Sequence, residues 1–223
     1  MGEIKDWGRE KPLFNLNEAQ RQLKEDRSYL KTKIQRAVQK GDLKRIERNK
    51  YTLHDDPLIY ASHIEKPSYI SLWSGLRYYD LTTQTPRKID VMTPVDRKDL
   101  DNIRFYYTQD MFGYKKKRYK GIEIFMAEKE KLLIDCLSRK QVAVSELIEL
   151  VEEVEIDKLV ELAERTGKKS VKKRLGFLFE KLRDEEVEEF MVEDTNYTPL
   201  ELSQPAEGEK NPDWMVLVNT DAL

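Results

Sequence analysis

The spacing of apolar residues near the start of the chain predicts a helix over residues 29–40. Four apolar side chains recur there at intervals of three and four residues, which places them on one face of a helix. We expect Ser28 to cap the N-terminus, because a serine hydroxyl accepts hydrogen bonds from free backbone N–H groups. Gly41 is expected to end the helix, since glycine readily adopts the left-handed conformation. The apolar residues are Leu30, Ile34, Ala37 and Val38.

A shorter polar helix is predicted over residues 17–24, with Asn15 or Asn17 as its cap. After the longer helix, residues 43–46 and 51–53 have the composition of two short strands. Asn49 lies between them and tolerates positive φ, so we expect a hairpin there. Helix, turn, helix and hairpin is the order of a winged helix-turn-helix, although residues 1–14 show no clear pattern for the first helix of that fold.

The rest of the chain mixes helical and strand patterns, which predicts an α+β fold with a mixed α/β second domain. Pro57 and Pro67 bracket a change from polar, basic sequence to aromatic and β-branched sequence. We therefore predict two domains, 1–57 and 58–223. The expected helices are 69–79, 127–137, one or two within 145–164, and 170–182, and the expected strands are 88–93, 103–108, 121–126 and 214–219, with a surface loop at 203–212.

Composition narrows the class of protein. The chain has 223 residues with 40 basic and 42 acidic side chains, so a nucleic-acid surface has to be a local patch. Its single cysteine, Cys136, lies in an apolar helix segment and excludes an internal disulfide. With two histidines and no long apolar run, we expect no metal, no cofactor, no membrane span and a cytoplasmic location.

Positive charge is concentrated in residues 27–50, which hold nine basic and two acidic side chains. Such a patch favours DNA binding, because cations that neutralise phosphates release counterions. Polar residues opposite the apolar helix face are expected to reach base edges, and flanking lysines and hairpin cations are expected to contact phosphates. The predicted DNA-binding residues are Ser28, Tyr29, Lys31, Thr32, Lys33, Gln35, Arg36, Gln39, Lys40, Lys44, Arg45, Arg48 and Lys50.

Several short motifs follow one another in order over residues 40–219, and together they resemble AbiEi-type antitoxins. The hairpin motif differs at Asn49, where the family usually has glycine. The residues expected to read bases are inferred from helix geometry, because the N-terminal helices are only loosely similar to those of the family. The motifs are Arg45 to Tyr51, Asp56-Pro57, Tyr60-Ala61-Ser62, Pro67 to Leu76, then Ala127, Glu130, Lys131, Leu133 and Asp135, then Arg174-Leu175-Gly176, Leu178 and Glu180, and finally Trp214 and Val218-Asn219.

The resemblance implies a transcriptional regulator and antitoxin of a type IV, abortive-infection toxin–antitoxin system, with a winged helix before an antitoxin domain. Such a protein represses its own operon at inverted repeats of double-stranded DNA and is not an enzyme. It counteracts a nucleotidyltransferase-like toxin without forming a stable complex. We expect a monomer or weak homodimer, because inverted repeats suit either two independent copies or a two-fold pair. A basic surface of the antitoxin domain is expected at Lys168, Lys169, Lys172, Lys173 and Arg174.

Other readings remain open. A metal-dependent nuclease needs neighbouring carboxylates and a lysine, for which Asp90, Glu123, Glu128 and Lys129 are the candidates. A module that only binds another protein is a third possibility. Residues 115–120 hold five basic side chains and predict a solvated loop or hairpin. An additional DNA contact and a phosphate site on the antitoxin domain are the alternatives.

Overall fold

The computed structural model describes residues 2–223 and has an α+β fold. In chain order the elements are α1 (Gly2–Arg9), α2 (Leu16–Leu23), α3 (Arg27–Gln39), β1 (Lys44–Glu47), β2 (Lys50–Thr52), α4 (Pro57–Ile64), β3 (Tyr69–Ile70), α5 (Leu72–Tyr78), β4 (Ile89–Thr93), β5 (Ile103–Tyr107), β6 (Tyr114–Tyr119), β7 (Ile122–Ala127), α6 (Lys129–Leu137), the 3₁₀ turn Val144–Leu147, α7 (Ile148–Glu153), α8 (Ile156–Thr166), α9 (Lys169–Arg183), the 3₁₀ turn Glu188–Phe190, β8 (Thr198–Pro199), β9 (Glu209–Asn211) and β10 (Val216–Val218).

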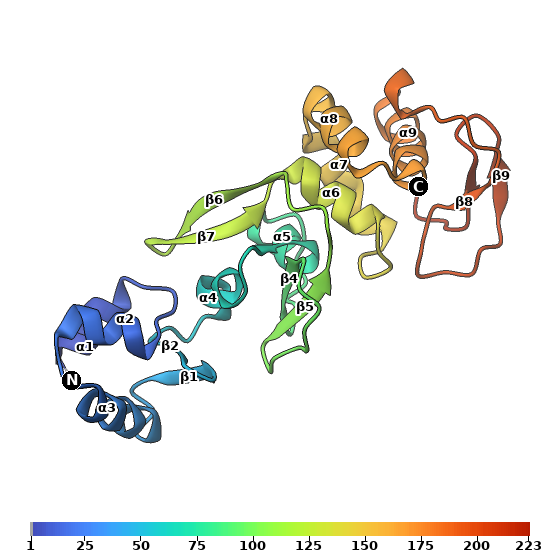
Figure 1. Ribbon diagram of the computed structural model, residues 1–223. Coiled ribbons are helices and arrows are strands. Elements are labelled where there is room, and N and C mark those ends of the chain that lie inside the picture. The colour runs from blue at the N-terminus through green and yellow to red at the C-terminus, as the bar shows by residue number, and fades with distance from the viewer. Residues whose placement is uncertain (1) are drawn as a thin grey trace.

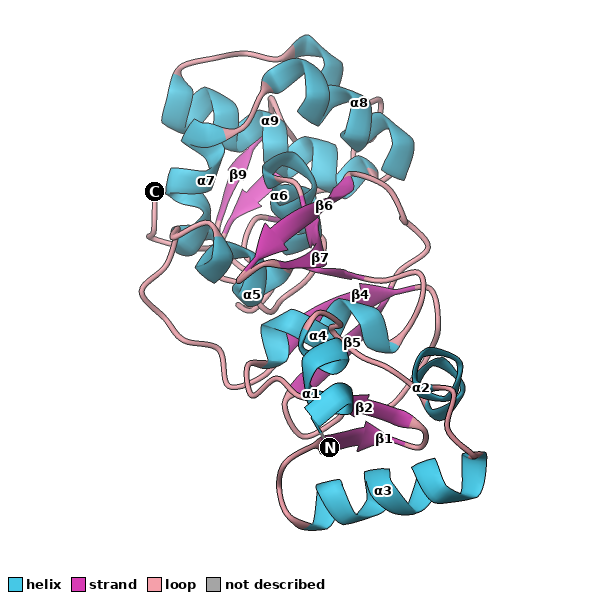
Figure 2. Ribbon diagram, turned by 90° about the vertical axis from the view of Figure 1, so that its left-hand side faces the viewer, coloured by secondary structure: helices cyan, strands magenta, loops and turns pink. Residues whose placement is uncertain are grey.

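The molecule is elongated, with α1 to β2 at one end and α9 with β8 and β9 at the other (Figure 1). Helix α3 lies at the extreme end, below the β1–β2 hairpin, in the orthogonal view (Figure 2). One hydrophobic cluster holds this end together and draws its buried residues from positions 4–43 alone. The predicted boundary at residue 57 falls where α4 begins and remains a prediction.

A five-stranded sheet forms the centre of the molecule, in the order β5-β4-β3-β7-β6. Strand β3 is antiparallel to β4 and parallel to β7, so the sheet is mixed. One face packs against α4 through a cluster that includes Tyr60, Ile64 and Val91. The larger core lies on the other face, under α5 to α9, and a three-stranded sheet β8-β10-β9 completes that end.

A buried polar set lies where α6 meets the sheet. Lys131 and Asp135 form an ion pair one helical turn apart, and both side chains are buried. Asp135 also accepts hydrogen bonds from Tyr69 (3.1 Å) and Ser71 (2.9 Å). The acceptor oxygens of Asp135 are thus satisfied inside the protein, which indicates a structural role for this part of the resemblance motif.

The structure corrects several expected elements. Residues 57–64 form α4, a buried helix capped by Asp56, in the segment between the two prolines for which no helix was predicted. Residues 69 and 70 are strand β3 and not the start of a helix, because their backbone pairs with β4 and β7. Residues 209–211 of the expected loop form β9. The basic segment 115–120 lies in the β6–β7 hairpin, so the hairpin predicted there is confirmed.

The N-terminal end contains an element that the sequence did not reveal. Residues 2–9 form α1, whose Ile4 is fully buried. A side chain at Gly8 would come within 2.8 Å of Leu53, so glycine permits close packing of α1 on the residue that follows β2. Phe14 pairs with Tyr51 as an isolated bridge, which adds a third strand position to the hairpin. The helical pattern was missed because α1 places few apolar side chains on its buried face.

Candidate nucleic-acid interface

Helix α3 is fixed by a cap at its start and by apolar contacts along one face. Asp26 accepts hydrogen bonds from the backbone N–H groups of Ser28 (2.8 Å) and Tyr29 (3.0 Å). The expected cap at Ser28 is therefore wrong by two residues, because the aspartate carboxylate occupies that role. Leu30 and Ile34 are buried beneath the helix.

The opposite face of α3 is exposed and carries no acidic residue. Its central residues have hydrogen-bonding side chains of the kind that read base edges in the major groove. Tyr29 is 61% exposed, which is unusual for a large aromatic side chain. The exposed residues of this face are Ser28, Tyr29, Lys31, Thr32, Gln35, Arg36, Gln39 and Lys40.

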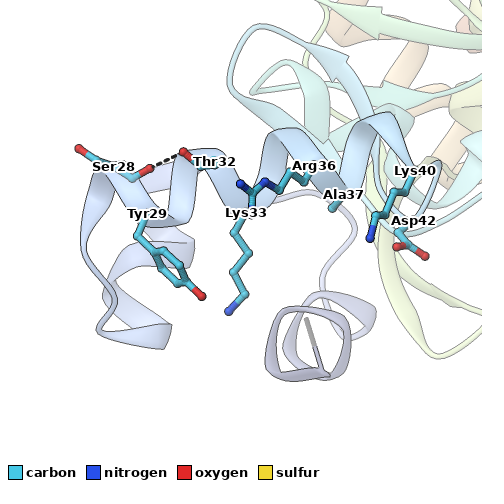
Figure 3. Close-up of a pocket in the computed structure, with 8 residues that line it drawn as sticks. All are labelled: Ser28, Tyr29, Thr32, Lys33, Arg36, Ala37, Lys40 and Asp42. Atoms are coloured by element: carbon cyan, nitrogen blue, oxygen red, sulfur yellow. Dashed lines mark hydrogen bonds between the residues drawn. The ribbon is translucent and has the colours of Figure 1, made fainter.

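A shallow groove of about 570 Å³ follows one side of α3. Tyr29, Lys33 and Lys40 project from the helix toward this side (Figure 3). Thr32 donates a hydrogen bond to the carbonyl of Ser28 (3.1 Å), which holds its side chain against the helix. The groove and the outer face together form a polar and mainly cationic surface at the tip of the molecule. Asp42 also lines the groove and is paired with Lys5.

Three predicted contact residues are engaged in ion pairs. Lys33 lies 2.6 Å from Glu25, and the hydrogen bond from this carboxylate raises the pKa of Lys33. Lys44 pairs with Asp55 at 2.5 Å. Lys50 pairs with Glu47 at 2.7 Å and also donates to the carbonyl of Ile64.

Five other cations are available. Within residues 2–223 they make no ion pair, and all are exposed. They are distributed over α3 and the hairpin, so they can meet more than one phosphate of a duplex. They are Lys31, Arg36, Lys40, Arg45 and Arg48. This distinction between engaged and available cations was not accessible from charge counting.

The hairpin turn has the predicted geometry. Asn49 adopts φ +61°, in the left-handed region that favours glycine. AbiEi-type antitoxins usually have glycine at the matching position. Its side-chain oxygen accepts a hydrogen bond from the backbone N–H of Leu16 (3.0 Å). This bond ties the turn to the start of α2 and leaves Arg48 exposed at the tip.

Arg97 joins the hairpin to the central sheet, and the sequence analysis did not single it out. Its guanidinium contacts Glu47 of β1 (2.7 Å) and Glu65 after α4 (3.0 Å), and it stacks over Phe105 at 4.2 Å. Burial opposes ionisation of Glu47, but hydrogen bonds from Lys50 and Arg97 hold its pKa below the usual value. No sequence spacing connects positions 47, 65 and 97, so only the fold reveals this contact.

Only part of the second predicted basic surface is exposed to solvent. Lys168 and Lys169 are exposed and Lys172 is half-buried, with Lys168 paired to Asp110 (2.5 Å) and Lys172 to Glu164 (2.5 Å). The prediction is wrong for Lys173 and Arg174, which are 1% and 4% exposed.

Both buried cations serve the fold. Lys173 pairs with Asp194 at 3.1 Å and donates to the carbonyl of Asn196 (2.5 Å). Arg174 donates to the carbonyls of Pro199 (2.8 Å) and Leu137 (3.0 Å), and burial lowers its pKa to about 10. These contacts join α9 to the C-terminal segment and to the end of α6.

The carboxylates considered for a nuclease are dispersed. Asp90 is buried on β4, whereas Glu123 on β7 is exposed and contacts Lys116 (3.1 Å). Glu128 pairs with Lys115 (2.7 Å) and Lys158 (3.0 Å), and Lys129 pairs with Glu153 (2.8 Å). Within residues 2–223, no three histidine, cysteine, aspartate or glutamate side chains are grouped as a metal ion requires.

Comparisons with known proteins leave the family unassigned: no protein-family model matches the chain, and no curated protein is significantly similar to it. In the described part of the chain, every helix is too short or too polar to cross a membrane.

Proposed function

We propose that this chain binds double-stranded DNA, with α3 in the major groove and the β1–β2 hairpin on the adjacent backbone, in the manner of a winged helix-turn-helix protein. The observation that carries the proposal is the exposed face of α3, which has no acidic residue. Five of the predicted contact cations, on α3 and the hairpin, make no ion pair within residues 2–223. The order α1, α2, α3, β1, β2, with Phe14 bridged to Tyr51, supports it.

The roles within the interface follow from reach and chemistry. Arg36 and Gln35 lie on the outward face of α3, where arginine recognises guanine and glutamine recognises adenine. Lys40, Arg45 and Arg48 are placed to contact phosphates, which fixes orientation without reading sequence. Lys33, Lys44 and Lys50 are secondary contacts, because each already has an acidic partner.

We further propose that the chain is a non-enzymatic regulator and antitoxin of a type IV toxin–antitoxin system, which represses its own operon in the cytoplasm. This finer assignment rests on the resemblance to AbiEi-type antitoxins. Two copies on an inverted repeat, as independent monomers or a weak dimer, would place two α3 helices on one side of the duplex, with half-sites about one helical turn apart. A nucleotidyltransferase-like toxin is the expected functional counterpart, without a stable complex.

A mobility-shift assay with the DNA upstream of the gene, in excess non-specific competitor, tests DNA recognition. The native protein is expected to shift this DNA. The double variant Gln35→Ala/Arg36→Ala should lose its preference for the upstream DNA over competitor DNA, by ~1–3 kcal/mol per base contact. Its binding to competitor DNA should persist.

The matched control is Lys168→Ala/Lys169→Ala, which removes two exposed cations at the opposite end of the molecule. It should bind the upstream DNA as the native protein does. Undiminished specific binding by the Gln35/Arg36 variant would show that α3 does not read the bases.

A further inference from the structure

A second cavity lies far from α3, against the face of the central sheet that α5 covers. It encloses about 230 Å³ and is lined by Trp73, Gln84, Arg87, Lys88, Asp90 and Arg104. Thr85 and Pro86 line both this cavity and a neighbouring one of about 590 Å³. Complete ligand pockets usually measure roughly 300–1,000 Å³, so the smaller cavity fits one ring system and leaves room for the remainder of a ligand outside it.

Strand geometry explains why charged side chains gather here. Asp90 on β4 lies directly beside Arg104 on the parallel strand β5. Lys88 is two residues before Asp90 and so lies on the same face of the sheet. The cavity therefore combines one carboxyl group with three cations, two from the sheet face and Arg87 from the preceding loop.

Asp90 is not used by the fold as an ion-pair partner. The residue is 3% exposed, and within residues 2–223 no lysine or arginine lies within ion-pair distance of its carboxylate. Burial raises the pKa of its carboxyl group to about 6, against the opposing effect of the nearby Arg104 charge. A buried carboxylate without an ion-pair partner is costly to folding, and such groups are concentrated at binding sites.

The cations of the cavity are also incompletely paired. Arg87 has no acidic partner among the described residues. Lys88 and Arg104 share the single carboxylate of Asp99, at 3.2 Å and 3.8 Å. An anionic group at the mouth of the cavity would therefore meet an excess of positive charge.

Trp73 supplies an aromatic wall. Its ring N–H donates to the carbonyl of Gln141 (2.7 Å), which fixes the orientation of the indole. An immobilised indole beside hydrogen-bonding groups favours planar heterocycles, since bases stack on aromatic side chains.

We propose that this cavity binds a free guanine nucleotide, with the base between Trp73 and Asp90 and the phosphate at Arg87 and Arg104. Guanine presents two adjacent N–H donors on its Watson–Crick edge, which match the two oxygens of a carboxylate. Adenine presents a donor beside an acceptor, and the acceptor would face the Asp90 carboxylate without a hydrogen bond. The site is separate from α3, so the proposal does not depend on DNA binding.

Titration calorimetry with GMP and AMP tests the site in the full-length protein, with Trp73 fluorescence as a second signal. GMP is expected to bind at least tenfold more tightly than AMP and to quench the fluorescence, and the quenching should be absent in Trp73→Phe. Asp90→Asn should abolish the preference for GMP, and Arg87→Ala should weaken GMP binding at least fivefold. A single-stranded guanine-rich oligonucleotide should bind the native protein and Asp90→Asn equally, since phosphate contacts at α3 and the hairpin do not involve this cavity.

Several results would overturn the proposal: no heat from GMP at millimolar concentration, equal affinity for GMP and AMP, or an Asp90→Asn variant that keeps the preference. Tight binding of the oligonucleotide that both Trp73→Phe and Asp90→Asn lose would assign the cavity to single-stranded nucleic acid instead. Because Asp90→Asn removes a buried charge, it is expected to fold, and circular dichroism checks that a loss of binding is local.

Discussion

Two segments of this chain are rich in lysine and arginine, and the structure uses them in opposite ways. Residues 27–50 place their cations on an exposed helix face and hairpin, where six of the nine have no ion pair in the described chain. Residues 168–174 bury Lys173 and Arg174 and engage Lys168 and Lys172 with carboxylates. Charge density in a sequence therefore does not distinguish an interaction surface from an internal polar network.

The difference arises from what lies on the other side of each helix. α3 has a single layer beneath it and solvent beyond, so polar residues occupy the whole outer face. α9 is covered on several sides, by α7, β10 and the strand β8, and its buried residues include Val171, Leu175 and Phe179. A cationic side chain on such a helix needs backbone carbonyls or a carboxylate inside the protein as hydrogen-bond acceptors.

The largest expected effect comes from Arg174. Arg174→Met removes one buried and one partly buried hydrogen bond, and leaves the carbonyls of Leu137 and Pro199 without this donor. We expect the free energy of unfolding to fall by ~3–5 kcal/mol, measured by denaturant titration. Lys168→Met, at an exposed position, is the control and should change stability by less than about 1 kcal/mol. Equal effects of the two substitutions would remove the distinction between the buried and exposed cations.

The next largest effect is a pH-dependent gain in stability when Asp90 is replaced by asparagine. Burial raises its pKa from 3.8 to about 6 in the folded state, so the folded protein disfavours the ionised carboxylate. Stability is therefore lost as the pH rises from about 4 to about 6, and the loss at pH 8 is about 3 kcal/mol. Asp90→Asn should be more stable than the native protein at pH 8 by up to that amount, and the difference should shrink as the pH falls toward 4. Unfolding measured across this range would contradict the account if the variant were less stable at pH 8.

A smaller effect is expected at the start of α3. Asp26→Ala removes the cap and should lower the free energy of unfolding by ~1 kcal/mol. Ser28→Ala, at the residue that the sequence had suggested as the cap, should leave thermal stability almost unchanged. A larger loss in the serine variant would restore the original assignment.

The sequence predicted much of the N-terminal end because local rules govern it. The 3.6-residue apolar spacing located α3, and the tolerance of Asn49 for positive φ located the hairpin. The cap was misplaced because Asp26 and Ser28 are both good capping residues, and only the backbone conformation distinguishes them. Helix α4 was missed because prolines at 57 and 67 resemble a linker, whereas Pro57 occupies the first turn of the helix, where proline is tolerated.

Tertiary contacts account for what could not be predicted at the candidate site. Whether a cation is available depends on acids distant in sequence, as for Lys44 with Asp55 and Lys168 with Asp110. The contact of Arg97 with Glu47 likewise joins positions fifty residues apart. Sequence patterns identify which residues share a helix face, but not which side chains meet across the fold.

The most direct test of the proposed interface is the salt dependence of DNA affinity, measured for the native protein and two double variants. Lys40→Ala/Arg48→Ala removes two available cations from α3 and the hairpin, and should reduce the slope of log K against log salt by about 2. Lys168→Ala/Lys169→Ala makes the same charge change at the other end of the molecule and should leave the slope unchanged. If both variants reduced the slope equally, or if the Lys40/Arg48 variant kept the native slope, DNA binding through α3 and the hairpin would be wrong.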